Sequence, residues 1–155
     1  MNTDIKNIKK IYQATKDGGD AETFHKKCDN IPNTLVLYKS AGNRRFGGFA
    51  SECWKATNNY IADKNCFLFS LDKKKIYPPK NNYFQIDLYS YNGPSFLNTG
   101  IYCIQLRNDA LKNSSLKTNE NIFKDIFDGE RNALSEDGNW AGVYAKEYEV
   151  FQIQF

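Results

Sequence analysis

Residues 34–71 read TLVLYKSAGNRRFGGFASECWKATNNYIADKNCFLFSL. This stretch contains three apolar runs, at residues 34–39, 45–54 and 66–71. A Gly-Asn turn separates the first run from the second, and a polar loop separates the second from the third. Short runs rich in aromatic and β-branched residues, bounded by turn-forming residues, are typical of β-strands. We therefore expect three strands of a sheet, whose apolar side chains the rest of the chain must cover.

The first of these runs is apolar on both faces. Successive side chains of a strand point to opposite sides, so Leu35 and Leu37 share one face while Val36 and Tyr38 share the other. This pattern is typical of a central strand that is covered on both sides. The last run has a similar pattern, in which two rows alternate: Phe67, Phe69 and Leu71 against Cys66, Leu68 and Ser70.

The middle run contains Gly47-Gly48 at its centre. Glycine weakens a strand, so a pair of glycines there predicts a β-bulge or the close approach of another backbone. A phosphate-binding loop is the alternative, but no GxGxxG or Walker pattern follows these residues. The structural interpretation is therefore favoured.

Two helices are expected before the first strand. In residues 1–15, the spacing of Ile5, Ile8 and Tyr12 predicts an N-terminal helix that packs on the sheet with one apolar face. Docking of a partner through that face is the alternative. Asp20 is expected to cap a second, shorter helix, whose buried side contains Ala21, Phe24 and Cys28.

The chain after residue 71 continues with short alternating runs, at residues 83–89, 101–106 and 148–155. Between them, residues 107–121 are polar and expected to be structureless, and residues 122–127 suggest one or two helical turns ended by Gly129. Seven to ten short strands with two leading helices predict a single domain over residues 1–155. The expected fold is a mainly β, two-sheet antiparallel sandwich flanked by short helices.

Composition argues against several classes of protein. The chain has 21 basic and 18 acidic residues, and the basic ones are scattered, so nucleic-acid binding is not expected. No apolar run is long enough to span a membrane, and the N-terminus has no secretory h-region, so we expect a cytoplasmic protein. The cysteines lack CxxC spacing, which argues against structural zinc and favours buried thiols: Cys28, Cys53, Cys66 and Cys103.

Residues that could carry chemistry are few, and no catalytic residue or cofactor is assigned. His25 and Cys28 are three apart on one flank of the second expected helix, the spacing of a nucleophile–base pair or of half a metal site. Carbohydrate binding through Trp54 and Trp140 ranks last. A hydrolytic or redox enzyme could also use carboxylates on strands: Glu52, Asp87, Glu147 and Glu149.

Several segments together resemble the TLDc domain of the oxidation-resistance proteins, and most closely the branch that many protists carry. The resemblance extends from about Ile8 to Phe155, although residues 107–137 follow the family pattern poorly. It rests on an ordered set of positions: Asp17, Gly18, Phe24, His25, Cys28, Asp29, Thr34, Leu35, Phe46, Gly47, Gly48, Trp54, Gly93, Glu149, Val150 and Phe151.

This resemblance implies a β-sandwich flanked by helices, in agreement with the strand pattern. It also implies a role in resistance to oxidative stress and, as in several family members, binding and regulation of the vacuolar-type proton ATPase. The family has no established catalytic mechanism, so the resemblance transfers no catalytic residues. We therefore expect a non-catalytic interaction domain, recruited to an organelle surface by a protein partner, with an undetermined oligomeric state.

Overall fold

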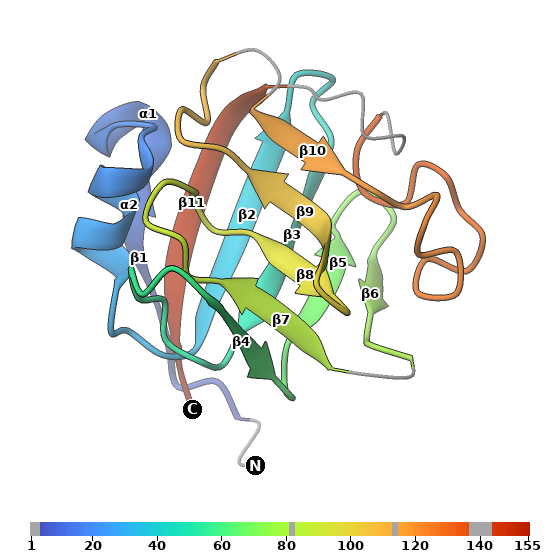
Figure 1. Ribbon diagram of the computed structural model, residues 1–155, viewed down its shortest axis with the longest axis horizontal. Coiled ribbons are helices and arrows are strands. Elements are labelled where there is room, and N and C mark those ends of the chain that lie inside the picture. Colours follow the sequence, from blue (N-terminus) through green and yellow to red (C-terminus); the bar gives the residue numbers. More distant parts are fainter. Residues whose placement is uncertain (1–3, 81–82, 113–114, 137–143) are drawn as a thin grey trace.

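A computed structural model describes residues 4–80, 83–112, 115–136 and 144–155 of the chain. Two antiparallel sheets pack face to face and confirm the expected sandwich (Figure 1). One sheet has six strands in the order β1-β11-β2-β3-β5-β6, and the other has five in the order β10-β9-β8-β7-β4. The strands are β1 (Asn7–Gln13), β2 (Thr34–Ser40), β3 (Arg45–Ala50), β4 (Tyr60–Asp63), β5 (Phe67–Ser70), β6 (Lys75–Tyr77), β7 (Phe84–Asp87), β8 (Phe96–Asn98), β9 (Ile101–Leu106), β10 (Leu116–Thr118) and β11 (Ala145–Gln154).

The core lies between the two sheets, where large aromatic side chains interdigitate. The Trp54 ring meets the Phe96 ring edge-on, with centroids 5.7 Å apart. Its indole nitrogen donates a 2.8 Å hydrogen bond to Oγ1 of Thr34, which satisfies the buried polar end of the side chain. Tyr38 crosses from β2 and donates its hydroxyl hydrogen to the carbonyl of Pro94, so one side chain joins the two layers.

The prediction of a helix in residues 1–15 is wrong. Asn7–Gln13 forms β1, which pairs with β11 so that Ile8 lies opposite Ile153, and the first helix, α1, spans only Ala14–Asp17. A register shift between Lys10 and Tyr12 turns Tyr12 into the core, whereas Ile8 stays 56% exposed. The apolar spacing fits a helix locally, but pairing with a strand near the other end of the chain decides the structure.

The second helix forms as predicted, over Ala21–Cys28, and is labelled α2. Oδ1 of Asp20 accepts a 2.8 Å hydrogen bond from the backbone N–H of Thr23, so Asp20 is the N-cap. The predicted buried side is confirmed, because Ala21, Phe24 and Cys28 are all in the core. Both helices lie beside β1 and β11, at one end of the sandwich (Figure 1).

The two central glycines allow the close approach that the sequence suggested. A Cβ atom on Gly47 would lie 1.8 Å from the carbonyl oxygen of Val36 in the neighbouring strand. A Cβ atom on Gly48 would lie 2.6 Å from the ring of Phe96 across the sandwich. The register between β2 and β3 runs without a shift, so a bulge is not the reason for either glycine.

Two segments that were expected to be irregular contain short strands. The polar loop of residues 55–64 includes β4, and residues 107–121 include β10, each at one edge of the five-stranded sheet. Both are edge strands with a single partner strand, and their polar composition gives no strand signal in the sequence. Residues 122–129 form successive turns that end at Gly129, whose φ of +77° is the left-handed conformation expected there.

Candidate interaction surface

The predicted pair of His25 and Cys28 does not form a reactive site. The side chain of Cys28 is 0% exposed, and burial raises the pKa of its thiol to about 12, with the nearby carboxylate of Asp29 adding to the effect. A nucleophilic cysteine requires solvent access and a lowered pKa. The structure therefore argues against this cysteine as a nucleophile.

His25 instead joins α2 to the loop before β8. Its Nδ1 lies 2.7 Å from Oδ1 of Asp29, and its Nε2 lies 3.2 Å from the carbonyl oxygen of Tyr89 and 3.1 Å from that of Asn92. Since carbonyl oxygens only accept hydrogen bonds, Nε2 is the donor in this arrangement. Both ring nitrogens are thus engaged by groups other than Cys28, which gives His25 a structural role.

The other positions of the family pattern also hold the fold together. The ring of Phe24 meets that of Trp54 edge-on at 5.6 Å, which joins α2 to the core. Asp17 accepts hydrogen bonds from Nζ of Lys27 and the backbone N–H of Gln13, and both bonds lower the pKa of its carboxyl group. Asp17, Phe24 and Trp54 thus lie at the junction of the helices with the sandwich, whereas Leu35 belongs to the outward side of β2 and Phe46 packs against Tyr38.

The candidate strand carboxylates are not brought together as an acid–base pair. Glu149 forms a 2.8 Å ion pair with Lys10, while Oε1 of Glu147 accepts a 3.0 Å hydrogen bond from the backbone N–H of Thr15. Asp87 is buried, and burial raises its pKa. Its oxygens accept hydrogen bonds, each of 2.7 Å, from the Tyr89 backbone, the Asn92 amide and the Tyr102 hydroxyl. Glu52 is exposed near the Trp54 end of the chain's second apolar run.

The last-ranked alternative, carbohydrate binding through tryptophans, gains no support from Trp54. Trp54 is fully buried, and Trp140 lies outside the described residues. Within the described ranges, no three His, Cys, Asp or Glu side chains gather closely enough to hold a metal ion. Neither helix of the described chain has the length and apolar character that crossing a bilayer requires.

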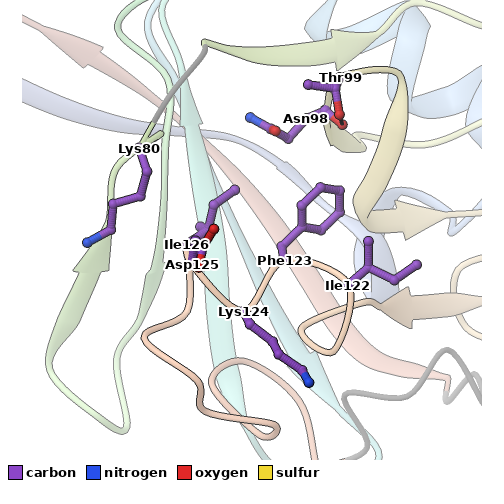
Figure 2. Close-up of a pocket in the computed structure, with 8 residues that line it drawn as sticks. All are labelled: Lys80, Asn98, Thr99, Ile122, Phe123, Lys124, Asp125 and Ile126. Carbon is purple, nitrogen blue, oxygen red and sulfur yellow. Dashed lines mark hydrogen bonds between the residues drawn. The ribbon is translucent and has the colours of Figure 1, made fainter.

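One surface pocket, of about 310 Å³, lies between the turn after β8 and the turns at residues 122–126. Figure 2 shows the ring of Phe123 pointing toward Asn98 and Thr99, with Lys80 on the opposite side. Charged side chains of both signs line it, namely Lys80, Lys124 and Asp125. This mixed lining fits no particular substrate class, so we assign the pocket no chemistry.

The outward side of the six-stranded sheet is a more distinctive feature. Its strands carry apolar residues on that side as well as toward the core, which the alternation in β2 and β5 had indicated. We call this surface the outer apolar face, defined by Ile8, Leu35, Leu37, Phe49, Phe67, Phe69, Leu71, Ile76, Phe151, Ile153 and Phe155.

The outer apolar face is ordered by contacts among its own side chains. Phe49 and Phe67 stack with ring centroids 5.3 Å apart, and Phe155 meets Phe49 edge-on at 6.3 Å. Leu35 and Leu37 remain half-buried, and Ile76 is 62% exposed. The outward side of the five-stranded sheet is mixed, because Gln85, Gln105 and Lys117 share it with Leu97, Tyr60 and Tyr102. A contiguous exposed apolar surface such as the outer apolar face is typical of an interaction site.

A groove of about 470 Å³ runs over this face. Leu35 and Leu37 of β2 line one side, and Phe67 and Phe69 of β5 line the other. The strand between them, β3, contributes Gly47 opposite Leu37 and Phe69, so it adds no side chain there. The alternation in β2 and β5 predicted the two-faced strands, whereas the run Ile76-Tyr77 is too short to show on which face Ile76 lies.

Comparison with known proteins agrees with the family resemblance. A family model described as the TLDc domain matches residues 1–154. The MTOR-associated protein MEAK7 of Xenopus laevis is 32% identical over 75 residues, which are 46% of this chain and 14% of that protein. The protein of the same name from Gallus gallus is 38% identical over 53 residues, 32% of this chain and 11% of that protein. The chain thus spans only a small part of the length of these curated relatives.

Proposed function

Because this chain belongs to the TLDc domain family, we propose that it is a non-catalytic interaction domain that binds and regulates the vacuolar-type proton ATPase. The observation that carries an interaction role is the outer apolar face, which leaves Ile76 and Leu71 strongly exposed. Large exposed apolar surfaces on one face of a domain favour protein association. The ATPase as partner is supported by the family resemblance.

The same proposal places the protein in the cytoplasm, at the surface of an organelle that carries the pump. Resistance to oxidative stress would then follow from control of the pump, and the chain itself would perform no redox step. In support of this proposal, the thiol of Cys28 is buried and the ring of His25 is hydrogen-bonded to the carbonyl oxygen of Asn92.

The test uses the purified chain and detergent-solubilised vacuolar-type ATPase. We expect the chain to co-elute with the pump in size-exclusion chromatography and to change ATP hydrolysis, or the integrity of the pump, in a dose-dependent way. Serum albumin at the same concentration serves as the control. Absence of co-elution and of any change in hydrolysis at tens of micromolar would overturn the pump as partner.

A second candidate partner is MTOR, because both curated relatives are named as associated with it. Co-precipitation of purified MTOR with the chain tests this candidate. Binding of MTOR without binding of the pump would replace the first proposal by the second.

A further inference from the structure

We propose that the outer apolar face is the docking site for an acidic amphipathic helix of a partner protein. The helix would lie in the groove between β2 and β5, with its apolar residues toward Leu37 and Phe67. This inference rests on the proposed function only in taking the partner to be a protein. It adds the surface, the secondary structure of the bound segment and the sign of its charge.

The first argument is the unusual composition of the sheet. Antiparallel sheets that face water on one side normally alternate apolar and polar residues, but β2 and β5 do not. Leu35, Leu37 and Phe67 stay half-buried rather than covered, although strands of this kind are usually packed on both faces. A bound partner with an apolar surface would bury these three side chains fully, as is usual for strands that are apolar on both faces.

The second argument is the shape of the groove. It lies between two rows of side chains on β2 and β5. Beneath it, β3 contributes Gly47 between Leu37 and Phe69, while Phe49 bounds the groove between Leu35 and Phe67. An amphipathic helix inserts its i, i+3, i+4 and i+7 side chains into such a groove. A helix laid along the strands could use Leu35 and Leu37 on one side and Phe69 on the other over a little more than one turn.

The third argument is the charge at one end of the groove. Lys39 lies directly across from Arg45 at the end of β2, and Lys74 and Lys75 line the groove beside them. Arg45 is paired with Asp72, and Lys75 is paired with Asp128 and Glu130. By contrast, Lys39 and Lys74 form no ion pair with any carboxylate in the described part of the chain.

The nearby carboxylates on this face are already engaged. Asp72 is paired with Arg45, and Glu149 is paired with Lys10. Glu147 lies directly across from Lys39 in the register, but its two oxygens accept hydrogen bonds from Thr15 and Gln13. Lys39 and Lys74, which lack an ion-pair partner in the described chain, therefore favour an occupant that carries carboxylates at the matching end. A second copy of the chain would bring another set of the same cations, so an acidic partner segment is the better match.

The experiment uses two synthetic helical peptides of about 16 residues, long enough for a measurable helix population. Both have leucines at i, i+3, i+4 and i+7. One has glutamates at the remaining positions of its C-terminal turn, and the other has lysines there. Fluorescence anisotropy gives the Kd, and ¹H–¹⁵N NMR shifts map the surface. We expect the acidic peptide to bind at least about tenfold more tightly, with shifts centred on the groove.

Matched variants locate the site. Ile76→Glu on the outer apolar face should weaken binding of the acidic peptide by about tenfold or more, since Ile76 lines the groove and a carboxylate there would face the apolar side chains and the glutamates of the helix. Ile122→Glu is the control, because Ile122 is 60% exposed, close to the 62% of Ile76, but lies outside this face. Lys39→Glu with Lys74→Glu should reverse the preference between the peptides, and Lys64→Glu should not.

The inference is overturned by equal binding of both peptides, by equal losses for Ile76→Glu and Ile122→Glu, or by concentration-dependent dimers that Ile76→Glu abolishes. Preferential binding to anionic phosphatidylserine vesicles with no peptide binding would also overturn it. The pump assay is read separately. Co-elution that survives Ile76→Glu rejects this surface and keeps the proposed function, whereas peptide binding without co-elution rejects the pump and keeps the surface.

Discussion

The hydroxyl group of Tyr148 donates a 2.8 Å hydrogen bond to the hydroxyl oxygen of Tyr12, which lies 136 residues earlier in the chain. The Tyr12 hydroxyl in turn donates its hydrogen to the carbonyl oxygen of Gly18. Both tyrosine side chains are buried, and burial raises the pKa of each, so both stay neutral donors. This relay joins β11, β1 and the turn between the two helices.

Removal of the first donor should therefore destabilise the fold. We expect Tyr148→Phe to lower the free energy of unfolding by about 0.5–1.5 kcal/mol, the usual net contribution of one buried hydrogen bond. Urea denaturation followed by circular dichroism measures the change. The control Tyr83→Phe, at a 46% exposed tyrosine, should have little effect. Equal stabilities for the wild type and Tyr148→Phe would show that the relay contributes nothing.

The glycine at the centre of β3 provides a second test. In Gly48→Ala, the new methyl group would lie 2.6 Å from the ring of Phe96, so the ring or the sheet must shift. Overpacking of this kind typically lowers the free energy of unfolding by about 1–3 kcal/mol. A smaller residue in place of the ring should relieve the clash. The double variant Gly48→Ala with Phe96→Leu should thus lose less than the sum of the single losses; additive losses would contradict direct contact as the cause.

Local sequence patterns predict some of these elements well and others badly, for physical reasons. The strand β2 and the helix α2 were predictable, because side-chain alternation and the Asp20 cap act within a few residues. The strand β1 was not, because its partner β11 is far away in sequence and a register shift disguises its period. The local spacing of apolar residues therefore favoured a helix, but pairing with β11 makes this segment a strand.

The candidate surface shows a similar division. Alternation revealed that Leu35 and Leu37 form an apolar row opposite the core side of β2. It could not reveal that this row stays uncovered, because coverage depends on how β3, β5 and β6 assemble beside it. The spacing of His25 and Cys28 correctly places them on one flank of a helix. The burial of the thiol and the hydrogen bonds of His25 to the loop before β8 depend on the tertiary structure, so helical spacing could not predict them.

Thiol chemistry separates the structural cysteines from an accessible one. Cys28, Cys66 and Cys103 are buried, and burial raises the pKa of each, whereas Cys53 is half-exposed. We expect iodoacetamide at pH 8 to label Cys53 first in the native protein, as read by peptide mass spectrometry. Labelling of all four in guanidinium chloride is the control. Rapid native labelling of Cys28 would contradict its burial and revive the nucleophile hypothesis.

Buried Glu120 allows a signed prediction for pH. Its Oε1 accepts hydrogen bonds from the backbone N–H groups of Leu134 and Ser135, at 2.9 and 3.2 Å, and so holds this segment to the end of β10. Despite these bonds, burial raises the pKa of Glu120 above its ordinary value of 4.5. The folded state therefore binds this proton more tightly than the unfolded state does. The stabilisation it provides is complete below pH 4.5 and is lost as the pH rises through the folded-state pKa.

Glu120→Gln keeps a carbonyl acceptor for both N–H groups and removes the titration. We expect the variant to gain stability relative to the wild type as the pH rises above about 4.5, as measured by urea denaturation across pH 4–8. Glu130→Gln provides a control of opposite sign, because the bond from Lys73 lowers the pKa of Glu130. Its relative loss of stability should develop as the pH rises toward 4.5. A difference between wild type and Glu120→Gln that is constant over this range would mean that the buried carboxyl group titrates alike in both states.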